Sequence, residues 1–176
     1  AKVRLIEMKP KKFSPAHKYK GFAELVCSNS LKASRINSAA GLLKEEMRRL
    51  GSLTVPCAEE NAVAAGGALA VDREKFSDSV TEKILSHPNI TLVSDEAETI
   101  PDGYCIIASG PLTDGKLAEN IGRLCGKRLS FFDAAAPIVT FDSIDMSKAF
   151  FAARYGRGGD DYINCPFTKE EYLTFH

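Results

Sequence analysis

The stretch DREKFSDSVTEKILSHPNITLV, residues 72–93, decides the fold. Asp72 stands where a helix N-cap is expected, and apolar side chains then recur at every fourth position from Phe76 to Ile84. His87-Pro88-Asn89 ends this helix, and residues 90–93 continue as a strand. A helix followed at once by a strand is typical of a layered α/β chain.

Two further strands are expected, one near the start of the chain and one later. Residues 2–6 form a short strand that ends in Glu7, and a loop rich in lysine and proline follows from Lys9 to Lys20. Tyr104–Ala108 is a compact apolar run that breaks at Ser109-Gly110-Pro111, as a buried parallel strand does where it reaches a ligand. The alternation predicts an α/β fold with a mostly parallel sheet, whose ligand crevice lies beyond the carboxyl ends of the strands.

Three more helices are expected. Gly41–Leu50 has an apolar face and sets Glu45 and Arg49 as an i,i+4 ion pair on the other face. Residues 116–125 form a second helix, and the capping-box pattern Thr168–Glu171 starts a third. The apolar face of the first helix consists of Leu42, Leu43, Met47 and Leu50.

Asp142 and Asp145 have two interpretations. As paired carboxylates they suggest a metal or acid site. Their place just before residues 146–153 favours the start of a helix instead, since Asp is a common N-cap. We therefore expect a helix over 146–153.

The composition excludes several classes of protein. The 23 basic and 23 acidic residues cancel, so no global charge attracts nucleic acid, and no apolar run nears the roughly 20 residues of a membrane span. Five cysteines without a C-x-x-C pair and three histidines without ligand spacing predict no metal site. The odd number of cysteines favours reduced thiols and a cytoplasmic location.

Two residues are candidates for chemistry. A carboxylate at a strand tip, such as Glu7, can accept both hydroxyl hydrogens of a ribose, although an ordinary exposed glutamate is the alternative. Cys27 precedes three small polar residues, which suits a loop that lines a ligand site. It is a candidate nucleophile, with a buried structural cysteine as the alternative, whereas Cys105 should be inert packing in its strand.

Two backbone and surface features complete the candidates. The pair Gly66-Gly67 lets the backbone approach a cofactor or another segment closely, with a plain turn as the alternative. A local basic cluster is a candidate contact for an RNA backbone, with a solvated loop as the alternative. Its members are Lys9, Lys11, Lys12, His17, Lys18 and Lys20.

Eight strings of the sequence together resemble one family, TrmFO, the folate- and flavin-dependent tRNA (uracil-5-)-methyltransferases. The resemblance runs in order along nearly all 176 residues. The strings are SPAH (14–17), FAELVCSNS (22–30), GLLKEEMRRL (41–50), GGALAVDRE (66–74), HPNI (87–90), ASGPLT (108–113), DAAAPIV (133–139) and NCP (164–166).

The resemblance implies a partial Rossmann-like FAD-binding domain of the glutathione-reductase type over residues 1–132. The start of an inserted α/β domain follows over residues 133–176. The implied enzyme moves the one-carbon unit of 5,10-methylenetetrahydrofolate to C5 of a T-loop uridine in tRNA, with FAD and NAD(P)H supplying reducing equivalents. A thiolate that adds to the neighbouring ring carbon makes C5 carbanion-like, so this chemistry needs an activated cysteine.

The resemblance also assigns site residues. Cys27 matches the catalytic cysteine that lies against the flavin, and Glu7 matches the acid that faces the adenosine ribose. Where relatives have Pro-Ala-Gly-Gly, this chain has Ala64-Ala65-Gly66-Gly67, which keeps both glycines. The cofactor-binding residues implied are Glu7, Met8, Lys9, Ser28, Asn29, Gly66, Gly67, Ala108, Ser109 and Gly110.

The same resemblance implies an internal piece of the enzyme, with the glycine-rich phosphate turn expected before Ala1 and a second functional cysteine after His176. A Rossmann sheet without its first strand has exposed edges, so poor solubility and weak FAD binding are expected of this piece alone. Three rivals stay open: a sister flavoprotein that modifies the wobble uridine of tRNA, a plain flavin oxidoreductase, and a nonenzymatic RNA-binding module built on the basic cluster.

Overall fold

The computed structural model describes residues 1–110, 112–126, 138–153, 156 and 159–176, and they form a mixed α/β fold. The chain divides into two compact units. The first unit comprises residues 1–27 and 73–135, and the second comprises residues 28–72 and 136–176. Each unit is described by itself, and the predicted boundary at 132/133 lies outside the described residues.

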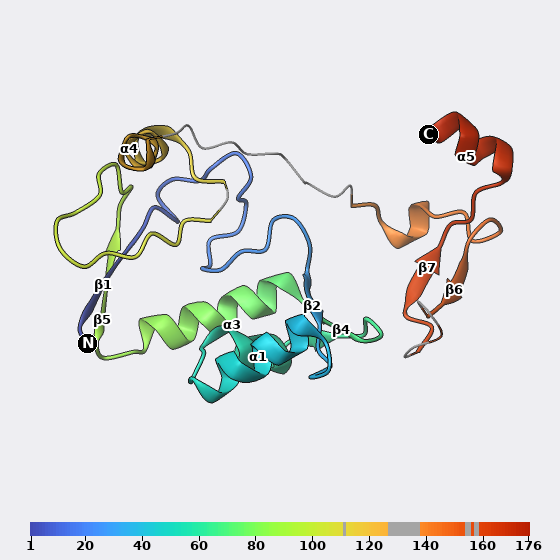
Figure 1. Cartoon of the computed structure of the whole chain (residues 1–176), viewed down its shortest axis with the longest axis horizontal. Helices are drawn as coiled ribbons and strands as arrows, with labels where there is room; N and C mark the ends of the chain where they lie inside the picture. Colours follow the sequence, from blue (N-terminus) through green and yellow to red (C-terminus); the bar gives the residue numbers. More distant parts are fainter. Residues whose placement is uncertain (111, 127–137, 154–155, 157–158) are drawn as a thin grey trace. The chain divides into compact units, whose positions relative to one another are not determined.

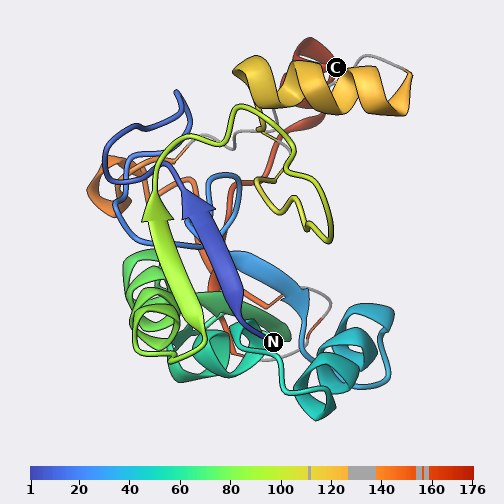
Figure 2. The ribbon, with the colours of Figure 1, turned by 90° about the vertical axis from the view of Figure 1, so that its left-hand side faces the viewer.

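The first unit is built on two parallel strands, β1 (Val3–Glu7) and β5 (Ile90–Ser94). They pair in register from Val3 opposite Ile90 to Glu7 opposite Ser94, so their carboxyl ends coincide (Figure 2). Helix α3 (Arg73–Leu85) leads into β5 and buries Phe76 and Val80. These two strands and this helix confirm the predictions for residues 2–7 and 72–93.

The prediction of a buried strand at Tyr104–Ala108 is wrong. These residues form an irregular, exposed segment, and Cys105 is exposed rather than packed in a core. A parallel strand is stable only beside a hydrogen-bonded neighbour, and β1 and β5 pair only with each other among the described residues. The expected parallel pairing is present between β1 and β5, whereas the other two sheets of the described residues are antiparallel.

Helix α4 (Gly115–Cys125) confirms the prediction for residues 116–125. The Asp114 side chain accepts a hydrogen bond from the Gly115 N–H at its start, and Gly126 ends it with a left-handed φ of 67°. None of its residues is buried. The capping signals at its two ends therefore define this helix.

The second unit has a three-stranded antiparallel sheet in the order β2 (Ser30–Ala33), β4 (Ala68–Val71), β3 (Ala62–Val63). Helices α1 (Ala39–Arg49) and α2 (Thr54–Glu60) lie between β2 and β3 in the chain. Figure 1 labels α1, β2 and β4 of this unit. The buried apolar residues of this unit are Val55, Cys57, Ala58, Leu69, Ala70 and Val71.

Helix α1 is confirmed, and so is its Arg49–Glu45 ion pair at 2.9 Å. The leucines of its apolar face, however, are not covered by any described segment, whereas Met47 is half-buried. Leu42 and Leu43 are exposed, whereas Lys44 is buried and donates from Nζ to the carbonyls of Ala33 and Ala40. Desolvation lowers the pKa of Lys44.

Residues 136–176 of the second unit include a 3-10 turn, η1 (Phe141–Ser143), an antiparallel hairpin of β6 (Phe150–Ala152) and β7 (Tyr162–Asn164), and helix α5 (Lys169–Phe175). The predicted helix over 146–153 is wrong, because Asp145 bonds Ser147 in a local turn and a strand follows. The capping box that starts α5 is confirmed.

No helix in the described part of the chain is long and apolar enough to cross a membrane.

Candidate functional site

Glu7 lies at the carboxyl end of β1, where the two parallel strands stop. Its carboxylate is half-buried and accepts a hydrogen bond from the backbone N–H of Lys9 at 2.9 Å. Its carbonyl accepts one from the Asp95 N–H, which ties the two strand ends together. The predicted strand-tip carboxylate is thus present at the edge where ligands bind parallel sheets.

Lys9 does not belong to a solvated basic cluster. It is only 4% exposed, and its Nζ donates to the Gly21 carbonyl and pairs with Glu24 at 3.5 Å. The prediction that its side chain is free for RNA is therefore wrong. Lys12 pairs with Glu96 at 2.5 Å, which leaves Lys11, Lys18 and Lys20 as exposed lysines of the loop.

Cys27 is exposed and forms no disulfide with any described residue. The alternative of a buried structural cysteine is wrong for Cys27, whereas Cys57 is fully buried in α2. An exposed thiol is accessible to a substrate, so the geometry leaves Cys27 available for chemistry.

The glycine pair forms a turn, as one alternative predicted. Gly66 has a left-handed φ of 56°, and the Ala68 N–H donates to the Ala65 carbonyl across the turn between β3 and β4. The turn also meets another segment closely: the Gly66 N–H donates to the Asp161 carboxylate at 2.6 Å.

The two groups of predicted cofactor residues in the second unit lie at opposite ends of β4. Asn29 and Val71 exchange hydrogen bonds at one end, where the Ser28 hydroxyl also accepts from the Ser30 N–H. Gly67 lies beyond the other end and binds Ser34 through its carbonyl. At about 3.4 Å per strand residue, roughly 14 Å separate Gly67 from Val71.

Ala108, Ser109 and Gly110 lie in an exposed turn ahead of α4. The Ser109 hydroxyl lies 2.6 Å from that of Thr113, which also donates to the Gly110 carbonyl at 2.7 Å. Gly110 has a φ of 83°, a backbone conformation that side chains disfavour.

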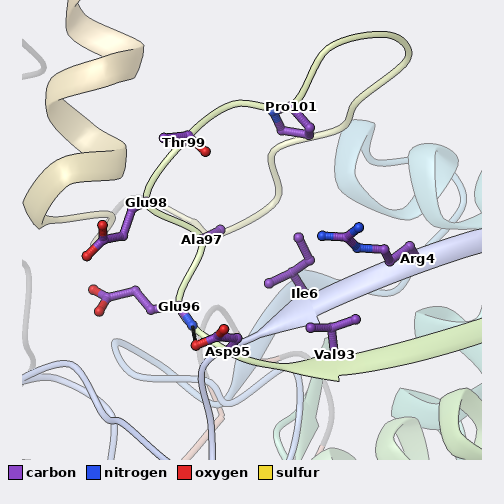
Figure 3. Close-up of a pocket in the computed structure, with 9 residues that line it drawn as sticks. All are labelled: Arg4, Ile6, Val93, Asp95, Glu96, Ala97, Glu98, Thr99 and Pro101. Atoms are coloured by element: carbon purple, nitrogen blue, oxygen red, sulfur yellow. Dashed lines mark hydrogen bonds between the residues drawn. The ribbon is translucent and has the colours of Figure 1, made fainter.

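A hollow of about 160 Å³ lies over the β1–β5 pair, on the face opposite Glu7 because strand residues alternate in direction (Figure 3). Arg4 and Ile6 line it from β1, and the loop after β5 carries its carboxylates. The Glu98 carboxylate raises the pKa of Lys116 through a 2.7 Å hydrogen bond and so ties α4 to this loop. None of the predicted site residues lines this hollow, and no described group of side chains could hold a metal ion.

The structure brings Glu7, Met8 and Lys9 together with Glu24, a residue that sequence reasoning missed. No periodicity marks Glu24, because its partners come from an irregular loop. Two charges 15 positions apart were the only signal in the sequence.

The whole chain is similar to known proteins. The model of the family described as glucose inhibited division protein A matches residues 1–176. Curated proteins named methylenetetrahydrofolate--tRNA-(uracil-5-)-methyltransferase TrmFO are similar to 99% of the chain. They are 60% identical in Acetivibrio thermocellus, 58% in Citrifermentans bemidjiense and 57% in Caldicellulosiruptor bescii. The chain spans 40–41% of the length of these relatives.

Proposed function

Because the chain belongs to the glucose inhibited division protein A family, we propose that its protein methylates C5 of a T-loop uridine in tRNA. The one-carbon donor in this proposal is 5,10-methylenetetrahydrofolate, and FAD and NAD(P)H supply the reducing equivalents. The observation that carries it is 57–60% identity to proteins with that methyltransferase name. We further propose that residues 1–132 are part of an FAD-binding domain and that residues 133–176 are the beginning of an inserted α/β domain.

The residues around Glu7 fit the nucleotide end of FAD. Lys9 N–H binds Oε1 of Glu7, and within the described chain no donor binds Oε2, which leaves it for a ribose hydroxyl. FAD, when bound, supplies the redox chemistry of the reaction. The other residues proposed to contact it are Met8, Lys9, Ser28, Asn29, Gly66, Gly67, Ala108, Ser109 and Gly110.

Cys27 is the proposed catalytic thiol. A thiolate that adds to the ring carbon next to C5 raises the electron density at C5, which can then accept the one-carbon unit. Its exposure supports this role, since the uridine must reach the sulfur atom. The plain flavin oxidoreductase needs no such thiol.

Transfer of labelled carbon from 5,10-methylenetetrahydrofolate to tRNA tests the proposal in the full-length protein. We expect Cys27→Ala to abolish transfer, whereas Cys105→Ala, which removes another exposed thiol of the same unit, should leave transfer intact. Absence of label in tRNA with the wild-type protein would refute the methyltransferase and favour the wobble-uridine flavoprotein.

Lys11, Lys18 and Lys20 are proposed to contact the tRNA backbone, because they are the exposed lysines that remain in the loop after Lys9 and Lys12 are paired. Reversal of these three charges should lower the affinity for tRNA and reduce the dependence of that affinity on salt concentration. FAD should stay bound. If the protein were only an RNA-binding module, no methyl transfer would exist for these changes to weaken.

A further inference from the structure

Lys9 and Glu24 form a nearly solvent-free ion pair in an irregular loop. Their side chains are 5% and 13% exposed, with Nζ and Oε2 at 3.5 Å. Both side chains have further partners: Lys9 Nζ also donates to the Gly21 carbonyl, and Oε1 of Glu24 accepts from the N–H groups of Lys18 and Tyr19 at 2.9 and 3.0 Å. We call these two residues the clamp.

Stability alone is a poor reason for such a pair. Desolvation of two charges offsets most of their attraction, so an apolar pair of similar volume would hold a fold as well. A buried pair can instead fix one geometry among several. The clamp gathers three stretches of chain: the end of β1, residues 18–21, and the segment that leads to Cys27.

Helix α3 fixes the same segment from the other side. The fully buried Ser77 hydroxyl donates to the Phe22 carbonyl at 2.5 Å, and the Phe22 N–H donates to Thr81 at 2.8 Å. A Cβ on Gly21 would collide with Ser77 Oγ, so the close contact between the loop and α3 favours glycine at this position. Ala23 then turns the chain with a left-handed φ of 52°, a conformation that side chains disfavour, and Glu24 follows it to Lys9.

Lys9 also connects the two proposed contact points of the cofactor. Its backbone N–H binds the Glu7 carboxylate, and its ammonium binds Glu24, three residues before Cys27. One residue therefore links the strand tip to the thiol segment through hydrogen bonds. Displacement of a reacting group by about 1 Å can cost on the order of a hundredfold in rate.

We propose that Lys9 and Glu24 are positioning residues that hold the Cys27 thiol in register with Glu7. The inference rests on the proposed function, because the clamp positions Cys27 for the proposed methyl transfer. The paired side chains of Lys9 and Glu24 touch neither uridine nor folate, and they act on Cys27 through the chain that carries it.

The test compares two double variants of the full-length protein. Lys9→Met with Glu24→Gln removes the clamp without leaving one buried charge alone. Lys116→Met with Glu98→Gln removes an exposed Lys–Glu pair of the same unit, 67% and 47% exposed, and serves as the control. The double variant Lys9→Gln with Glu24→Gln, which removes both charges but keeps side-chain hydrogen-bonding groups, replaces the first double variant if that does not fold.

The clamp variant should lose about tenfold or more in kcat for methyl transfer, with KM for tRNA within about twofold. Alkylation of Cys27 by iodoacetamide should change by about threefold or more, and the amides of Lys18 and Tyr19 should exchange hydrogen faster. The control should match the wild type in all three. A clamp variant with the kcat and Cys27 alkylation rate of the control would overturn the proposal.

Failure of the proposed function gives a different result. In that case the wild-type protein transfers no methyl group, and Cys27 alkylation alone decides the clamp. A changed alkylation rate then supports a positioned thiol in another reaction, and an unchanged rate refutes the positioning role.

Discussion

Helices α3 and α1 have the same kind of sequence and different surroundings. Both carry apolar residues at helical spacing, and both form where the spacing predicts them. In α3 the apolar positions are covered, with Phe76 at 2% and Val80 at 3% exposure. In α1 they are open, with Leu42 at 48% and Leu43 at 56%.

The difference separates two physical questions. Apolar spacing and end signals decide that a helix forms and which face is apolar. Only contact with another segment decides whether that face leaves water, and this contact supplies most of the stabilisation. The loop that contains Phe22 covers α3, and within the described residues α1 has no such cover for its leucines.

The largest expected effect is at the covered helix. Phe76→Ala should lower the free energy of unfolding by about 3–5 kcal/mol, because it leaves a cavity in the core of the first unit. Urea unfolding of the full-length protein, followed by circular dichroism, measures it. A loss below about 1 kcal/mol would break the comparison, since Phe76 would then be no more covered than Leu43.

Gly21→Ala probes how closely the loop covers α3. The added methyl collides with the fully buried Ser77 hydroxyl, so we expect a loss of about 1–3 kcal/mol in the same experiment. Adding Ser77→Ala should restore part of the loss, because it removes the atom that collides. Equal losses of unfolding free energy in the single and double variants would show that the Ser77 hydroxyl does not cause the strain.

Helix α5 has no buried residue among those described and is expected to depend on its cap. Thr168→Ala should cost about 1 kcal/mol of helix stability, measured as loss of helical ellipticity. Hydrogen bonds from Thr168 lower the pKa of Glu171, so this carboxylate stabilises the helix above its unfolded pKa. The contribution should disappear as the pH falls through the folded pKa, and a helix signal that is constant with acid would contradict it.

The smallest effect is expected at the open helix. Leu43→Ala should change the free energy of unfolding by less than about 0.5 kcal/mol, because the side chain is already exposed. Alanine is also a better helix former than leucine, which offsets part of any lost contact. A loss of about 2 kcal/mol or more, as is typical of buried leucine, would show that another segment covers α1.

Sequence reasoning predicted the elements whose signals are local. The N-cap position and apolar period gave α3, the capping box gave α5, and the i,i+4 pair of α1 formed as expected. It failed where an element needs a distant partner. Tyr104–Ala108 has the composition of a strand but no neighbour to bond among the described residues, and residues 146–153 begin like a helix but pair partly as β6.

The candidate site shows the same limit. Glu7 at a strand tip and Cys27 before small polar residues were identified from the sequence, and the structure exposes the thiol. The burial of Lys9 and its pairing with Glu24 were not identified. Both depend on an irregular loop that folds back on α3, which no periodic pattern encodes.

The sequence by itself therefore determined helices α1, α3, α4 and α5, strands β1 and β5, and the residue types suited to flavin and thiol chemistry. Tertiary structure alone decided which apolar faces are buried, which lysine is removed from water, and which strand finds a partner. The reason is physical: capping and periodicity act within a few residues, whereas desolvation and strand pairing require segments that the chain brings together only on folding.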